Sequence, residues 1–179
     1  YNSDMIILGL DLSTSITGAT LLNEKGDTIL CEAWDTRNKK YFPTIFHKAR
    51  FIRNKILDLG WPVKRVFVEQ SLQSFRSGFS SAQTLSTLAR FNGIISWICF
   101  HDLNREPEYI AATTARKFCG IKVPRGQKAK EVALQYFLDN GNEIKYTRHG
   151  NPKPGSYDRA DSWIVAHAGY KLWKKSLQF

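Results

Sequence analysis

Cysteine is scarce in this chain, and the few cysteine residues lie far apart in the sequence. The 179 residues hold three, and no two of them form a C-x-x-C pair. That spacing excludes a disulfide framework and a zinc ribbon, and it fits a reducing compartment. Long apolar runs are missing as well: no stretch approaches the roughly 18 residues of a membrane span, and no basic amphipathic helix stands out. We therefore expect no membrane partner.

Acidic residues are few relative to basic ones. Asp and Glu number 16 against 26 Lys and Arg, which gives a formal net charge of +10. A surplus of this size favours a polyanionic partner, because neutralising phosphates releases the counterions condensed on them. With no repeat, low-complexity tract or dividing linker, residues 1–179 are predicted to form a single domain. Met5 is typical of a natural start, so residues 1–4 are expected not to be native.

The pattern of apolar residues predicts a mixed α/β fold. Residues 5–34 form three short apolar segments, the last two joined by the turn sequence NEKGD, and are typical of an antiparallel meander. Later strands alternate with helices, which predicts a mixed central sheet, the meander plus parallel strands, flanked by helices. We expect strands near 5–12, 17–22, 28–34, 64–70 and 107–112, and helices near 41–59, 81–102, 113–120, 129–138 and 157–173.

Three local features accompany this pattern. Thr113 is placed to cap the short helix at 113–120. The apolar side of the helix at 81–102 is wide enough to be buried on two sides. Residues 140–156, with three Gly and two Pro, are typical of a long flexible connection.

Two apolar strands end in a carboxylate. In MIILGLDLSTSITG the strand alternates, so Gly9 and Asp11 share a face, and Gly9 leaves room beside the aspartate. Glu69 ends the short strand KRVFVEQ in the same way. A charged residue at the end of a central strand is costly without a partner. Taken singly, each is equally well explained as a surface residue at a strand end.

The helix YDRADSWIVAHAGYKLW, 157–173, begins with two aspartates three residues apart. Asp158 and Asp161 lie on one face, where like charges repel unless a cation separates them. One interpretation is a capping pair at the positive end of the helix dipole. The other joins them with Asp11 and Glu69 in a set of four carboxylates, the ligands that Mg²⁺ or Mn²⁺ prefers. Two such ions about 3.5–4 Å apart can bind one phosphodiester and activate the attacking water.

Several motifs together resemble the RuvC-type Holliday junction resolvases of the RNase H-like (retroviral integrase) superfamily. IILGLDLSTSITGATLL is similar to the first strand and hairpin of that family, and VFVEQ to its second motif. SSAQTLSTLARFNGII resembles the helix used in dimer contacts, and TTARKFCGIKVPRGQKAKEVALQYF the basic segment that ends in a lysine-bearing helix. YDRADSWIVAHA matches the closing D-x-x-D-A-like motif. The motifs keep the family's order over nearly the whole chain.

The resemblance implies a homodimer that binds a four-way DNA junction and makes two symmetric nicks, each leaving a 5′-phosphate and a 3′-hydroxyl. It implies two Mg²⁺ ions per active site, with Mn²⁺ as a substitute. Asp11 and Asp161 would bridge or hold the ions. Glu69 would help to hold the ion that activates water, and Asp158 would complete the set. Such a protein acts in recombination or repair, in the cytoplasm of a bacterium or a phage-infected cell, with an organelle as the alternative.

Basic and aromatic residues around these motifs are candidates for DNA contacts. The family's junction-probing aromatic falls nearest to Leu72, so Phe75 or Phe79 is expected to stack on an unpaired base; the alternative is a loop aromatic packed on the core. The family's catalytic-side lysine corresponds to Lys128 or Lys130, of which we favour Lys128. The other expected contacts are Arg76, Arg116, Lys117, Lys122, Arg125, Arg148 and Lys153.

Two other functions fit part of the pattern. A ribonuclease H that cuts RNA–DNA hybrids would share the carboxylates, but its motif order and basic segment differ. GLDLSTSITGATLL followed by EKGD also resembles the first phosphate loop of actin-like sugar kinases. Those ATP-binding enzymes need two such domains and usually have a Gly where this chain has Ser13. The resolvase is therefore the function that the sequence favours.

Overall fold

The computed structural model describes residues 4–70 and 81–178 and places five strands in one sheet. β1, β2 and β3 form an antiparallel meander, β4 pairs in parallel with β1, and β5 pairs in parallel with β4. The resulting order, β3-β2-β1-β4-β5, is the mixed sheet that the sequence predicts. The strands are β1 (Ile7–Asp11), β2 (Ile16–Leu22), β3 (Thr28–Asp35), β4 (Arg65–Gln70) and β5 (Glu108–Ala111).

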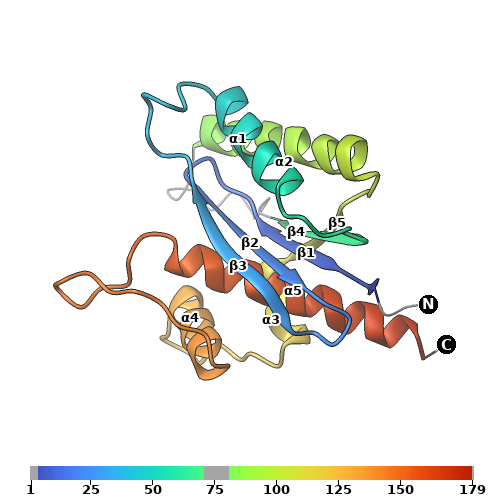
Figure 1. The fold of residues 1–179 in the computed structure, drawn as a ribbon. Coiled ribbons are helices and arrows are strands. Elements are labelled where there is room, and N and C mark those ends of the chain that lie inside the picture. The colour runs from blue at the N-terminus through green and yellow to red at the C-terminus, as the bar shows by residue number, and fades with distance from the viewer. Residues whose placement is uncertain (1–3, 71–80, 179) are drawn as a thin grey trace.

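Helices cover both faces of this sheet (Figure 1). One face carries α1 (Ile45–Leu57) and α2 (Ala82–Leu103). The other carries α3 (Ala112–Phe118), α4 (Ala129–Asp139) and α5 (Ser156–Ser176). The order of strands and helices along the chain is the predicted one. Within the described residues, no helix is both long and apolar enough to cross a lipid bilayer.

The alternation of β1 divides its side chains between two apolar cores. Leu8 and Leu10 are fully buried against residues of α1 and α2. Ile7 and, on β4, Phe67 lie in a second core with residues of α5. Because helices cover both faces, both sets of alternate positions are apolar, as in the buried strands of α/β proteins. Asp11 follows Ile7 by four residues, so it points to the α5 side of the sheet.

Glycines let α5 approach the sheet closely. A Cβ at Gly9 of β1 would lie 2.6 Å from the Cβ of Ala166, and one at Gly18 of β2 would overlap the carbonyl oxygen of Asp158. The backbone of α5 therefore rests directly on these two strands. The prediction that Gly9 leaves room beside Asp11 is wrong, because Ala166 occupies that space.

We expect Gly18→Ala to destabilise the protein by about 2 kcal/mol or more, since the added methyl group forces the start of α5 to move. Chemical denaturation measures the change. Gly93→Ala is the matched control, because Gly93 lies in α2 and a Cβ there meets nothing within 4 Å in the same chain; since Gly93 also lines the groove between α1 and α2, both variants are measured at concentrations where the protein is monomeric. Alanine at that position should leave the free energy of unfolding unchanged or raise it by up to about 1 kcal/mol. An unchanged free energy of unfolding for Gly18→Ala would contradict this packing.

Two helix starts differ from those expected. α3 begins at Ala112, directly after the last residue of β5, and its N-cap, Ala111, offers no side-chain hydrogen bond. Thr113 therefore lies inside the helix and is not its cap, because the strand runs straight into the helix. α1 begins later than predicted, because the side chain of Thr44 caps it by accepting a hydrogen bond from the backbone N–H of His47.

Candidate active site

The carboxyl ends of β1 and β4 place two carboxylates side by side. Leu10 pairs with Val68 across the parallel strands, so Asp11 and Glu69, each one residue further on, are neighbours. Glu69 follows Phe67 by two residues, and Phe67 packs in the core with α5, so both carboxylates point to the α5 side of the sheet. The charge of Glu69 and hydrogen bonding to it both raise the pKa of Asp11, as expected of two carboxyl groups that lie close together.

α5 begins at the same edge and brings two more carboxylates to it. Its N-cap is Gly155, whose φ of 94° is left-handed and whose lack of a side chain allows it to pack against Ala33 of β3. Asp158 lies in the first turn of α5, and Asp161 follows three residues later. Since a glycine fills the N-cap position, neither aspartate is the N-cap of α5, and only Asp158 lies in its first turn.

Side-chain hydrogen bonds fix α5 on the β2–β3 hairpin. The hydroxyl groups of Thr20 and Ser162, both fully buried, share a hydrogen bond of 2.8 Å. Further along the helix, the indole Nε1 of Trp163 donates to the hydroxyl oxygen of Thr28 at 3.0 Å. Ser162 directly follows Asp161, so these bonds also set where the aspartates lie relative to the strands.

Burial and mutual repulsion raise the pKa of three carboxyl groups at this edge. The pKa of Asp11 lies well above its usual range, chiefly through burial and then through the charges of Glu69 and Asp161. The pKa of Asp161 rises to about 8, mainly through burial and then through Glu69 and Asp158. Burial also raises the pKa of Asp158. The structure thus brings the four predicted carboxylates together, and we call them the acidic cluster.

The positive charges near the acidic cluster do not outweigh its burial and the mutual repulsion of its carboxylates. Arg116 of α3 lowers the pKa of Asp161, and Arg37 lowers that of Asp158, but in both cases the raising effects are larger. The largest causes of the shift in the pKa of Asp11 all raise it. In the part of the chain that the structure describes, no Lys, Arg or His forms an ion pair with any of the four carboxylates.

Arg37 is a residue near the site that the sequence analysis does not single out. Its Nη2 lies 2.7 Å from Oδ2 of Asp35, at the end of β3. The predicted meander could have indicated it, because in an antiparallel meander the third strand ends at the same edge of the sheet as the first. Residues directly after β3 must therefore lie near Asp11.

The predicted basic segment, residues 113–137, covers most of α3, the loop that follows it and most of α4. Of the two candidate catalytic-side lysines, Lys128 is exposed at the N-cap of α4, without a side-chain cap. Lys130 places its Nζ 4.9 Å from the ring centre of Tyr157, the residue before Asp158. Lys130 therefore contacts the residue next to Asp158, although the sequence favours Lys128. The exposed basic residues of this segment also include Lys117, Lys122 and Arg125.

Arg148 and Lys153 lie in a hairpin, residues 145–153, that projects from the body of the protein (Figure 1, orange). Its backbone hydrogen bonds run from the N–H of Thr147 to the carbonyl oxygen of Asn151 (2.7 Å) and from Lys153 to Lys145 (2.9 Å). The prediction of a flexible connection at 140–156 is wrong here, because its Gly and Pro residues form hydrogen-bonded turns.

The segment between β4 and α2 holds the remaining predicted DNA contacts. Phe75, Arg76 and Phe79 all lie at 71–80, outside the described residues. Their roles stay predictions.

The acidic cluster offers oxygen donors to a cation. In the described residues, no group of three or more His, Cys, Asp or Glu side chains is placed so that it could hold a metal ion. The donor set nevertheless fits Mg²⁺ or Mn²⁺, since these ions take carboxylate oxygens and no ion pair between described residues neutralises the cluster. With a basic segment on one side, the edge is suited to chemistry on a phosphate ester.

A mixed five-stranded sheet with helices on both faces and acidic residues at the ends of β1 and β4 is an RNase H-like fold. Solved structures with this fold match nearly the whole chain. RuvC of T. thermophilus, in complex with a Holliday junction substrate, has a TM-score of 0.68 and 15% identity, covering 96% of each chain.

Two further solved structures also match the fold of this chain. The yeast mitochondrial Holliday junction resolvase Ydc2 has a TM-score of 0.64 and 14% identity over 99% of this chain and 82% of its own. The fowlpox virus resolvase, in complex with substrate Holliday junction DNA, has a TM-score of 0.58 and 15% identity over 94% and 99%. No protein-family model and no curated protein matches the chain. The protein therefore has the fold of the RuvC-like resolvases, as the sequence motifs predict.

Proposed function

We propose that this protein is a metal-dependent endonuclease that resolves four-way DNA junctions by paired, symmetric nicks. The observation that carries the proposal is the acidic cluster: four carboxylates, remote in sequence, meet at one sheet edge with none of them ion-paired within the described residues. Carboxylates in such a place are stabilised by a divalent cation. The substrate class is supported by RuvC and the fowlpox resolvase, which share the fold and are seen with Holliday junctions.

The acidic cluster would hold two divalent ions, Mg²⁺ or Mn²⁺. Asp11 and Asp161 would bridge or hold the ions. Glu69 would help to hold the ion that activates the attacking water, and Asp158 would be the fourth carboxylate ligand. When bound, such ions supply activation of water and stabilisation of the departing 3′-oxygen. The water oxygen forms a bond to phosphorus and the P–O3′ bond breaks, which leaves a 5′-phosphate and a 3′-hydroxyl. Raised pKa values fit this role, since metal binding displaces protons from ligands.

The basic residues near the cluster would hold the DNA backbone. Arg116 is the best placed, because its charge already acts on Asp161. Lys128 is proposed as the lysine on the catalytic side. Lys130 is the alternative, because its contact with the ring of Tyr157 holds it beside Asp158. Further phosphate contacts are proposed for Lys117, Lys122, Arg125, Arg148 and Lys153, and junction contacts for Phe75, Arg76 and Phe79.

One gel assay tests the proposed function. A synthetic four-way junction, a linear duplex, a flap and an RNA–DNA hybrid are each incubated with and without Mg²⁺. We expect paired nicks at symmetric positions in the junction, only with the metal, and ends that ligase can seal. Cutting of the hybrid alone would indicate a ribonuclease H. No cutting of any substrate, together with ATP hydrolysis in a separate phosphate-release assay, would indicate the kinase-like alternative. Either result would overturn the proposal.

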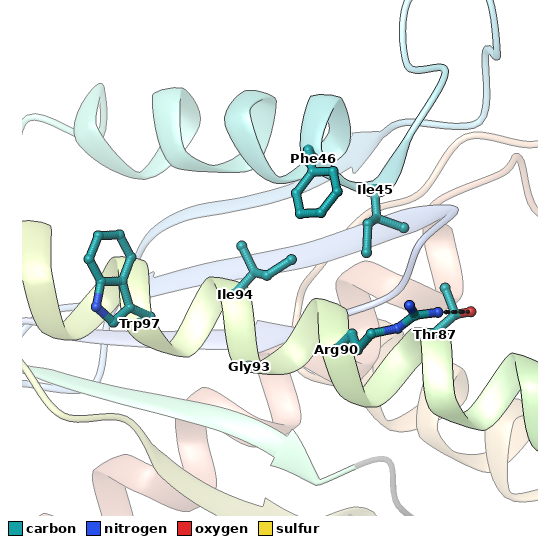
Figure 2. Close-up of a pocket in the computed structure, with 7 residues that line it drawn as sticks. All are labelled: Ile45, Phe46, Thr87, Arg90, Gly93, Ile94 and Trp97. Atoms are coloured by element: carbon teal, nitrogen blue, oxygen red, sulfur yellow. Dashed lines mark hydrogen bonds between the residues drawn. The ribbon is translucent and has the colours of Figure 1, made fainter.

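We also propose that two copies pair through the outer side of α1 and α2. α2 is not buried on two sides as predicted: Ile95 lies in the core, whereas Trp97 and Phe100 are 58% and 55% exposed. Phe46 of α1 is 68% exposed. Phe46, Ile94 and Trp97 line a groove of 640 Å³ between the two helices (Figure 2). Exposed aromatic residues grouped in this way are typical of a protein interface, and a second copy would complete the burial of α2.

Trp97→Glu should convert the dimer to a monomer, because a charge at the centre of an apolar interface costs about 2 kcal/mol or more. Analytical ultracentrifugation measures the state, and we expect about a 30-fold weaker dimer. Paired nicks on the junction should become single, uncoordinated nicks. Trp61→Glu is the matched control, since Trp61 is 49% exposed and does not line the groove. A wild-type protein that is monomeric with its junction would contradict the pairing.

A further inference from the structure

The connection between β3 and α1, residues 36–44, lies at the same edge of the sheet as the acidic cluster. β1 ends there at Asp11, and the meander returns β3 to that edge at Asp35. Thr36 donates hydrogen bonds from its backbone N–H (2.8 Å) and its hydroxyl (3.1 Å) to the carbonyl oxygen of Ser15, in the turn after β1. Figure 1 shows the connection at the end of the sheet where α5 begins. It is therefore anchored beside the cluster.

This connection and the start of α1 carry four cations. Arg37 is held by Asp35. Lys39 and Lys40 are exposed, while Lys48 donates from its Nζ to a backbone carbonyl oxygen just beyond β1. Burial and the charge of Lys39 lower the pKa of Lys48, so the positive charges are close enough to repel. Among the ion pairs between described residues, none includes any of these three lysines.

The acidic cluster lies between this group and the predicted basic segment. The charge of Arg37 acts on Asp158, and that of Arg116 acts on Asp161. β3 and β5 are the two outer strands of the sheet, and α3, which carries Arg116, continues directly from β5. Positive charge thus flanks the carboxylates from both sides, and none of the DNA contacts predicted from the sequence lies in the β3–α1 connection.

We infer that the β3–α1 connection binds the phosphate backbone of the cleaved DNA strand, on the side of the scissile phosphate opposite to Arg116. Lys39 and Lys40 contact phosphates directly, and Arg37, oriented by Asp35, faces the strand where it leaves the acidic cluster. A chain of phosphates fits better than a single anion, because these cations are spread along the connection. The inference rests on the proposed nuclease function and adds to it the path of the strand.

The test measures how binding depends on salt. Asp161→Asn protein, in which cleavage is blocked, binds a fluorescent four-way junction at several salt concentrations, with and without the further changes Lys39→Ala and Lys40→Ala. Each phosphate contact contributes about 0.9 to the slope of log K against log[salt], so the double change should reduce the slope by about 1 to 2. Lys174→Ala with Lys175→Ala is the matched control at the far end of α5, roughly 25 Å away, and should leave the slope unchanged.

A second measurement changes the DNA instead of the protein. Neutral methylphosphonates replace single phosphates on either side of the cut. Substitution on one side should weaken binding by the Asp161→Asn protein but have no further effect once Lys39 and Lys40 are alanine. One outcome is that the wild type binds and cuts the junction while both lysine changes leave the slope of log K against log[salt] and the effect of the methylphosphonates unchanged. That result would contradict the inference but not the proposed nuclease function. If the wild type neither binds nor cuts the junction, the proposed function fails and the inference with it.

Discussion

Replacing Asp161 by asparagine should abolish cleavage of the four-way junction while binding persists. The amide keeps the size of the side chain but removes an anionic ligand from the acidic cluster, and the loss of one such group lowers the rate by about 10³-fold or more. The basic surface that holds the DNA is unchanged. Single-turnover cleavage in Mg²⁺ measures the rate, and fluorescence anisotropy in EDTA measures the affinity.

Asp139→Asn is the control for this change, since Asp139 is exposed at the end of α4, away from the cluster. It should cut the junction at the wild-type rate. Asp11→Asn should behave as Asp161→Asn does, because Asp11 is the member on which the other three carboxylates act. Cleavage by Asp161→Asn at more than a tenth of the wild-type rate would remove this aspartate from the proposed site.

In the absence of metal, the protein should lose stability as the pH rises from about 4 to about 8. The unfolded chain releases its carboxyl protons near pH 4, whereas the folded protein keeps the proton on Asp161 up to about pH 8. Between these values the folded state binds more protons, so the free energy of unfolding falls as the pH rises, by about 1.4 kcal/mol per pH unit for each retained proton. The stabilisation is complete below about pH 4.

Thermal and chemical unfolding in EDTA between pH 5 and 8 measure this slope. Asp161→Asn should flatten it and be more stable than the wild type at pH 8, because the amide carries no charge to bury. Mg²⁺ should stabilise the wild type most at pH 8, where its ligands are ionised, and should not stabilise Asp161→Asn to the same extent. A free energy of unfolding that rises steadily with pH in EDTA would contradict the raised pKa values.

Much of the fold follows from periodicity in the sequence. The alternation of apolar residues in β1 predicts which side chains face each layer, and both layers are as expected. The meander and the order of helices follow from the turn at 23–27 and from the spacing of apolar residues. These features are local, so a single sequence is enough to read them.

Features that depend on tertiary contact are the ones that the sequence did not reveal. Gly155 replaces the aspartates as N-cap because the helix must start against Ala33, a contact between distant parts of the chain. The space beside Gly9 is filled for the same reason. Arg37 acts on Asp158 only once β3 has been added to the sheet. The hairpin at 145–153 depends on hydrogen bonds between backbone groups, which residue types alone do not specify.

The acidic cluster combines Asp11 and Glu69 of the first two parallel strands with two aspartates of α5, which is synthesised much later, and this order determines when the cluster can form. During synthesis the N-terminal part leaves the ribosome first and can begin to fold, yet a nascent chain that stops before Ser156 has only Asp11 and Glu69. Half of the carboxylates arrive with the last helix, which docks on glycines of the first two strands. If the protein is the proposed nuclease, an incomplete chain without α5 cannot cut DNA. A complete protein whose α5 detaches from the sheet loses its cleavage activity.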